Sequence, residues 1–138
     1  MSRFLFVVPP LAVHVNPTVS VGRELARRGH EVAWAGLPGA VDALLPPDAP
    51  FLPAGSPEAL GHVDDLRRRS QGLRASAAFK FLWENVLLPL AYAMVDGVDD
   101  VVARWGPDVV VSDQQTLAGA AVACRRGLPW ATSATTSA

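Results

Sequence analysis

The sequence has a single cysteine and a net charge close to zero, and each of these low counts excludes a class of protein. The 138 residues carry a formal net charge of −1, which gives no electrostatic basis for binding nucleic acid or an anionic membrane. Cys124 cannot form an internal disulfide, and no Cys or Cys/His spacing matches a metal site. We therefore predict a cytoplasmic protein without a metal site, with Cys124 as a buried thiol on an apolar helix face.

Long apolar runs and the common phosphate and hydrolase motifs are also missing. The most apolar later segment, residues 86–95, is too short to cross a membrane and contains Pro89. No GxGxxG follows the first apolar run, and neither a P-loop motif nor GxSxG occurs. The sequence thus predicts no membrane span, no phosphate site within this domain and no serine hydrolase.

Apolar runs alternate with helical patterns along the chain. Arg3 to Val8 is almost wholly apolar, as expected of a strand buried on both faces of a parallel sheet. Asn16 and Pro17 predict the start of a helix that Asn16 caps, and Gly29 predicts its end. Glu31 to Gly36 then completes a right-handed strand-helix-strand unit. We therefore predict an α/β fold, a Rossmann-like doubly wound parallel sheet in a single domain.

The same signals predict the remaining elements. The apolar stripe of the first helix consists of Thr18, Val21, Gly22, Leu25 and Ala26, and Gly22 would permit a close contact with a strand. After the second strand we predict a short helix at 39–45, a strand at 50–53, a short helix near 63–70, a helical stretch at 77–104 bent near Pro89, a strand at 108–112, a helix at 117–126 and a strand at 129–133.

Two polar residues stand at the ends of two predicted strands. His14 follows the first strand in the segment VVPPLAVHVNP, and Asp113 ends the run PDVVVSD. In a doubly wound sheet of order 3-2-1-4-5, the order reverses between strands 1 and 4, whose carboxyl ends flank the ligand crevice. His14 could there remove a proton from an alcohol or phenol while Asp113 fixes its tautomer. The alternative is that His14 packs beside the first helix and Asp113 is an ordinary strand-end residue.

Other polar residues indicate structural roles. His30 lies near a helix carboxyl end, where a cation is favourable. Three carboxylates recur at helical spacing and predict a solvated face rather than a metal site: Asp96, Asp99 and Asp100. The basic run at residues 67–69 predicts a second solvated face, because it follows acidic residues on the same helix.

Three segments carry a family resemblance through their order and spacing: VHVNP, ELARRGHEV and PDVVVSDQQTLAGAAVACRRGLPW. They resemble the amino-terminal domain of GT-B-fold family 1 glycosyltransferases, especially actinobacterial enzymes that glycosylate antibiotics and other natural products. The resemblance spans nearly the whole chain, and residues 54–80 contribute little to it. It implies an inverting transfer of sugar from a nucleotide-diphosphate sugar to a hydroxyl of a natural-product acceptor, without a metal or another cofactor.

The resemblance also assigns roles to individual residues. It implies that His14 is the general base and that Asp113 orients it. Val13 stands where the family often has glycine, and Asn16 matches a pocket-lining or capping residue. We expect Val13, Asn16 and Gln114 to contact substrate.

The irregular and aromatic region at about residues 54–95 is expected to choose the acceptor. Within it, Phe79 and Trp83 are candidate contacts for a flat ligand. We therefore expect a hydrophobic small molecule, aromatic or polyketide-like, as the acceptor that binds this domain.

The family resemblance further implies a second domain that holds the nucleotide sugar. We expect this carboxyl-terminal donor-binding domain to be absent from the 138 residues, so that the chain alone binds acceptor and transfers no sugar. Homo-oligomerisation is left open. Two alternative functions also stay open at this point: a non-catalytic binding or regulatory subunit, and half of another GT-B enzyme such as a lipid-linked sugar transferase or a nucleotide-sugar epimerase.

Overall fold

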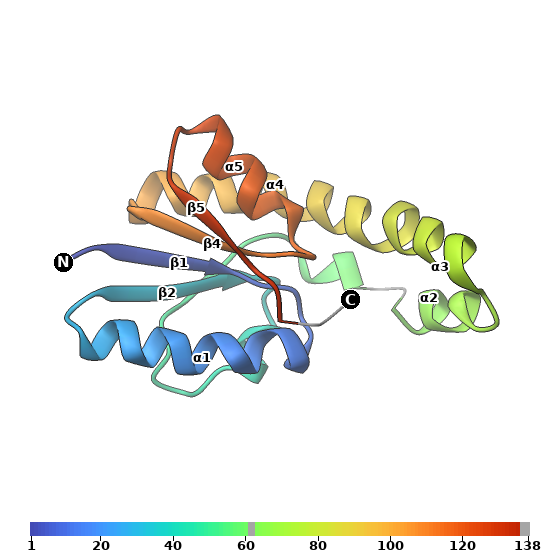
Figure 1. Ribbon diagram of the computed structural model, residues 1–138, viewed down its shortest axis with the longest axis horizontal. Coiled ribbons are helices and arrows are strands. Elements are labelled where there is room, and N and C mark those ends of the chain that lie inside the picture. The colour runs from blue at the N-terminus through green and yellow to red at the C-terminus, as the bar shows by residue number, and fades with distance from the viewer. Residues whose placement is uncertain (61–62, 136–138) are drawn as a thin grey trace.

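Five parallel strands form one sheet in the order β3-β2-β1-β4-β5 (Figure 1). The computed structural model describes residues 1–60 and 63–135. The strands are β1 (Arg3–Val7), β2 (Glu31–Gly36), β3 (Phe51–Pro53), β4 (Val109–Asp113) and β5 (Trp130–Ser133). The helices are α1 (Ala12–Arg27), α2 (Val63–Ser70), α3 (Ala75–Leu82), α4 (Leu88–Trp105) and α5 (Leu117–Arg125). The predicted α/β class and strand order are confirmed.

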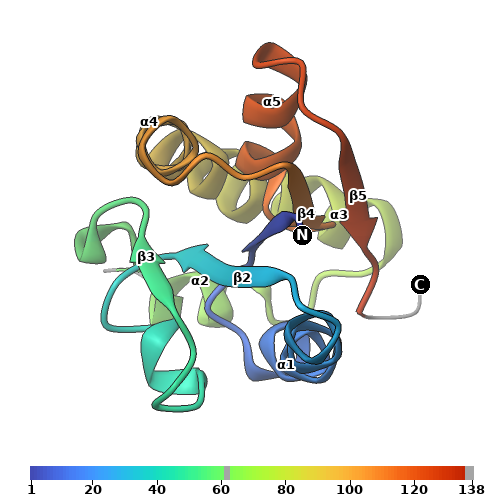
Figure 2. The same cartoon turned by 90° about the vertical axis from the view of Figure 1, so that its left-hand side faces the viewer.

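Helices cover both faces of the sheet, with α1 on one side and α4 and α5 on the other (Figure 2). Along β1, Leu5 and Val7 belong to the core that includes residues of α4 and α5, whereas Phe6 belongs to the core that includes α1. This alternation follows from the two-residue period of a strand, and it explains why the first apolar run shows no polar face.

The first helix begins earlier than predicted. The N–H groups of His14 and Val15 both donate to the Leu11 carbonyl, at 2.9 and 3.0 Å, so the first turn forms before the Asn16–Pro17 pair. Pro17 lies inside the helix, and Asn16 is exposed and does not cap it. The predicted start was therefore wrong, and its correction places His14 in the first helical turn rather than in the preceding loop.

The buried face of α1 is also shifted from the predicted stripe. Val21 is 53% exposed and Ala26 is exposed, whereas His14 and Val15 are buried. The prediction for Gly22 is confirmed: a Cβ atom there would lie 2.6 Å from the ring of Trp34 on β2. A side chain at this position would therefore separate helix from sheet.

Between the third and fourth strands the chain forms helices that extend beyond the sheet (Figure 1). A π-helical turn at Trp83–Leu87 separates α3 from α4, and Pro89 follows in the first turn of α4. The predicted division near Pro89 is thus confirmed, since a proline cannot donate the regular backbone bond. We call residues 63–87 the helical arm. None of the described helices is long and apolar enough to cross a membrane.

Two smaller expectations were wrong. The helix predicted at 39–45 is a single 3₁₀ turn at Asp42–Leu44, because the prolines that follow leave too few residues for a stable α-helix. Cys124 is exposed, because the buried side of α5 consists of Ala118, Gly119, Val122 and Ala123.

Candidate active site

His14 and Asp113 meet at the carboxyl edge of the sheet, although 99 residues separate them in the sequence. β1 and β4 are adjacent strands, with Val7 opposite Ser112. Asp113 is the last residue of β4, and His14 lies in the first turn of the helix that follows β1. The juxtaposition predicted from strand order is therefore present.

The two side chains form a buried pair. His14 Nδ1 lies 3.1 Å from Asp113 Oδ1 and 3.0 Å from Oδ2, and the two side chains are 2% and 0% exposed. A carboxylate only accepts hydrogen bonds, so the neutral imidazole carries its proton on Nδ1. The lone pair is then on Nε2, the nitrogen that these contacts leave free to accept a proton.

Backbone and side-chain donors hold the Asp113 carboxylate in place. The Gln115 N–H donates to Oδ1 at 2.8 Å. Thr116 fixes the turn that follows Asp113, because its hydroxyl donates to the Val7 carbonyl on β1 at 2.8 Å. Asp113 therefore ends a strand whose following turn is tied to β1, so its orientation toward His14 is fixed by the sheet edge.

A third side chain, from Thr135, joins the pair. Its Oγ1 lies 2.9 Å from His14 Nδ1 and donates to Asp113 Oδ2 at 3.3 Å. Sequence reasoning missed this residue. Thr135 follows β5, which pairs with β4, so the same argument that joined His14 to Asp113 would also have brought the polar segment after the fifth strand to this edge.

A groove of about 560 Å³ lies between the loop after β1 and the helical arm. Its walls are mostly apolar. Two of its lining residues are bonded to the dyad residues: the Leu11 carbonyl accepts the His14 N–H, and the Gln115 N–H donates to the Asp113 carboxylate. The lining residues are Pro9, Pro10, Leu11, Ala40, Ala59, Leu66, Arg67, Ser70, Ala78, Phe81, Leu82, Asn85, Val86, Pro89, Leu90 and Gln115.

The same fold occurs in solved glycosyltransferases. The structure of SsfS6, a glycosyltransferase of Streptomyces sp. SF2575, superposes with a TM-score of 0.76 at 22% identity, over 96% of this chain and 39% of SsfS6. The glycosyltransferase SnogD of Streptomyces nogalater also gives 0.76, at 23% identity, over 98% of this chain and 35% of SnogD. This chain has the fold of the amino-terminal half of a GT-B glycosyltransferase.

Sequence comparison agrees with the structural one. The chain is 29% identical over 126 residues to demethyllactenocin mycarosyltransferase of Streptomyces fradiae. The match covers 85% of this chain and 25% of the mycarosyltransferase. No family model matches the sequence. The chain therefore resembles actinobacterial natural-product glycosyltransferases, and it spans between a quarter and two fifths of their length.

The two aromatic residues predicted to contact the acceptor, Phe79 and Trp83, do not line the groove. Phe79 and Trp83 contact each other with ring centroids 6.1 Å apart, but the groove lining includes neither, and Phe79 is 63% exposed. Phe81 is the aromatic residue among the described lining residues. Ala78, Phe81, Leu82 and Asn85 recur at helical spacing on the groove side, which places residues 79 and 83 on other faces.

The three other predicted substrate contacts lie around the dyad. Val13 is 64% exposed and Asn16 is exposed, both in the first turns of α1. Gln114 is half-buried, and its N–H donates to the Ser133 carbonyl on β5 at 3.0 Å. None of the three belongs to the groove lining. Their predicted contacts with substrate stay predictions.

The remaining polar candidates have structural roles in the described part of the chain. His30 Nδ1 accepts the Ser2 N–H at 3.0 Å, a structural contact that differs from the cationic role predicted at the helix end. Asp99 was predicted to be solvated but is paired: Arg126 and Arg125 donate to its carboxylate at 2.7 and 2.8 Å and so join α4 to α5. These two arginines hold the pKa of Asp99 well below its usual value. Within residues 1–60 and 63–135, no three His, Cys, Asp or Glu side chains gather as metal ligands.

Proposed function

We propose that this chain is the acceptor-binding part of an inverting glycosyltransferase, which transfers a sugar from a nucleotide-diphosphate sugar to a hydroxyl of a natural-product acceptor. The observation that carries the proposal is the buried His14–Asp113 pair beside an apolar groove, on the fold of glycosyltransferases. Neither the pair nor the fold alone implies the reaction, because folds host many functions.

In the proposed step, His14 Nε2 takes the proton of the acceptor hydroxyl as its oxygen bonds to the anomeric carbon. The bond between that carbon and the diphosphate oxygen breaks, and the nucleoside diphosphate leaves with the electron pair. Attack from the face opposite the leaving group inverts the anomeric centre. Asp113 keeps the Nδ1 proton in place and stabilises the imidazolium that forms.

The groove supports the acceptor side of this proposal. Its volume of about 560 Å³ falls within the roughly 300–1,000 Å³ of small-molecule sites. Its apolar walls suit a hydrophobic aglycone, and its position beside Leu11 and Gln115 would bring an acceptor hydroxyl toward the dyad.

The donor side of the proposal rests on the relatives. SsfS6 has been solved in complex with thymidine diphosphate, and VinC in complex with dTDP. We infer that the reaction uses a nucleotide-diphosphate sugar held by a second, donor-binding domain, and no metal. The matched proteins named here are all glycosyltransferases, so they give no support to the regulatory-subunit and epimerase alternatives.

The experiment compares the purified chain alone with the chain joined to a donor-binding domain from a glycosyltransferase such as SsfS6. A panel of aromatic and polyketide acceptors is incubated with nucleotide sugars, and products are detected by mass spectrometry. We expect the chain alone to bind acceptor without turnover and the joined protein to form glycoside. Turnover by the chain alone would contradict the division of labour, and acceptor binding without transfer in every folded joined protein would contradict the catalytic role.

A further inference from the structure

The helical arm carries an excess of positive charge. Its sequence contains five cations, Arg67, Arg68, Arg69, Arg74 and Lys80, against three acidic residues, Asp64, Asp65 and Glu84. Such a cluster creates a local positive potential although the whole chain is nearly neutral. These cations differ in whether a carboxylate pairs with them.

Most of the arm's cations have partners within the arm. Arg68 and Arg69 lie 3.7 and 3.8 Å from the carboxylate of Asp65. Arg69 also stacks over the ring of Phe81, 5.4 Å from its centroid. Lys80 lies 3.8 Å from Glu84. These contacts turn the cations toward the arm itself.

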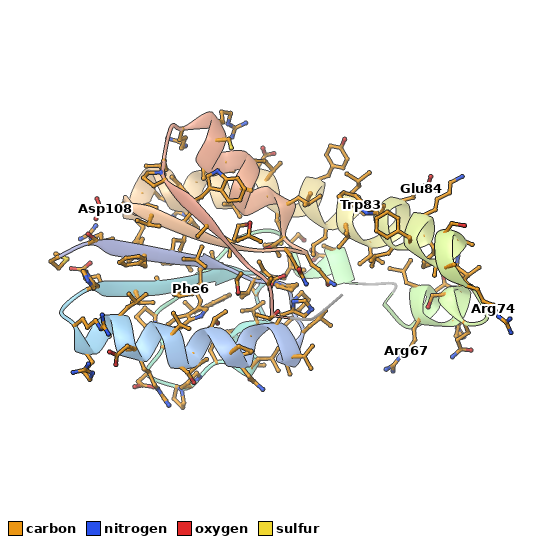
Figure 3. The ribbon with its side chains drawn as sticks, viewed as in Figure 1. Phe6, Arg67, Arg74, Trp83, Glu84 and Asp108 are labelled. Atoms are coloured by element: carbon orange, nitrogen blue, oxygen red, sulfur yellow. The ribbon has the colours of Figure 1, made fainter. Side chains whose placement is uncertain are left out.

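Arg67 differs from its neighbours on α2. It lines the groove, which Arg68 and Arg69 do not, and no ion pair joins it to a carboxylate in the described part of the chain. Figure 3 shows its side chain extending from α2 away from α3. Arg67 therefore belongs to the groove wall and has an exposed side chain.

The other lining residues determine how strongly Arg67 could attract an anion. Among the described lining residues none is acidic, and the polar side chains other than Arg67 are neutral: Ser70, Asn85 and Gln115. Apolar walls lower the local dielectric, so an anion beside Arg67 is attracted more strongly than on an open surface. A guanidinium also matches the geometry of a carboxylate through paired hydrogen bonds.

We propose that Arg67 makes the groove selective for flat apolar molecules that carry an anionic group, such as a carboxylate or an ionised phenol. Such a ligand would place its rings against Phe81 and Leu82 and its charge beside Arg67. Calling the ligand an acceptor rests on the proposed function, whereas the binding preference stands without it. The apolar walls favour an organic anion over free phosphate, which could use only the single cation.

The test uses two fluorescent dyes of nearly equal shape: anilinonaphthalene sulfonate, which is anionic, and phenylnaphthylamine, which is neutral. Binding of both to the purified chain is titrated for the unaltered sequence, Arg67→Ala, Arg67→Lys and Arg68→Ala. Arg68 is the matched control, because both arginines lie in the last turn of α2 and lose the same helix-end charge. Ala78→Trp, which fills the groove, shows whether the dyes bind there.

We expect Arg67→Ala to weaken binding of the anionic dye roughly three- to tenfold and to leave the neutral dye unchanged, with Arg67→Lys in between. Arg68→Ala should change neither, and Ala78→Trp should abolish both. Equal losses for both dyes, equal effects of Arg67→Ala and Arg68→Ala, or dye binding that survives Ala78→Trp would each overturn the proposal. Displacement of the anionic dye by inorganic phosphate, beyond the effect of sodium chloride at equal ionic strength, would indicate a plain anion site and would also overturn it. None of these readouts depends on sugar transfer.

Discussion

The carboxyl edge of the sheet and the helical arm are built in opposite ways. At the edge, polar side chains are buried and hydrogen-bonded: His14 and Asp113 are 2% exposed and pair with each other, and the fully buried Thr116 donates to the Val7 carbonyl. In the arm, α3 contains no buried residue, and its charged side chains are exposed. In the proposed function, the residues that need a fixed geometry thus stand at the sheet edge, whereas the proposed ligand contacts stand on the more exposed arm.

The largest expected difference between the two regions concerns catalysis. Asp113→Asn keeps an oxygen for the Gln115 N–H but turns an amide donor toward His14 Nδ1, which forces the proton onto Nε2. In the chain joined to a donor-binding domain, the transfer rate should fall by roughly 10²–10⁴-fold with little loss of stability. Asp96→Asn, exposed on α4, is the matched control. Full activity of Asp113→Asn would reject the dyad.

A second prediction tests how closely α4 packs against the segment that follows β3. A Cβ atom at Gly97 on α4 would lie 2.5 Å from the backbone nitrogen of Gly55 and 2.9 Å from the carbonyl carbon of Ala54, the residues that follow β3. Backbone cannot move aside cheaply, so Gly97→Ala should lower the free energy of unfolding by about 1–3 kcal/mol. Urea unfolding measures this loss, and Asp96→Ala should stay within about 0.5 kcal/mol of the parent. Equal stability of the two variants would show that α4 packs less closely than described.

A smaller effect is expected at Thr135, which touches the dyad from the segment after β5. Thr135→Val removes a hydroxyl that lies 2.9 Å from His14 Nδ1 while preserving the shape of the side chain. Transfer should fall roughly three- to tenfold, and Thr135→Ser should restore it. The Nδ1 proton signal of His14 should also shift in the NMR spectrum of the valine variant. An unchanged signal would show that Thr135 does not help to position the ring.

The smallest effect is a pH dependence of stability at the ion pairs between α4 and α5. Arg126 and then Arg125 lower the pKa of Asp99 from its ordinary value of 3.8. A carboxylate with a depressed pKa in the folded state stabilises above its ordinary pKa and loses this contribution as pH falls. Asp99→Asn should therefore lower the melting temperature slightly at neutral pH and less so in acid. A difference from the parent that is independent of pH would contradict the pairing.

Strand order and the dyad were predictable because they depend on long-range rules. Nearly unbroken apolar runs predict buried parallel strands, and the reversal of strand order places the ends of β1 and β4 together. His14 and Asp113 follow from these two facts. Thr135 was missed only because the argument was not extended to the neighbouring strand β5.

Local features were less predictable because competing local signals had to be weighed. Asn16 and Pro17 form a strong helix-start signal, yet the turn already closes on the Leu11 carbonyl. Phe79 and Trp83 were predicted to contact the ligand because they are aromatic. The helix face that lines the groove, however, contains Phe81. The sequence of α3 alone does not specify which of its faces turns toward the groove.

The central claim, that His14 is the base of a glycosyl transfer, has one direct measurement. The transfer rate of the protein joined to its donor domain is compared for the parent and for His14→Ala, with folding verified by circular dichroism and dye binding to the groove. The account predicts a loss of roughly 10²–10⁴-fold while both folding and dye binding persist. A folded His14→Ala variant that transfers sugar at the parent rate would contradict it.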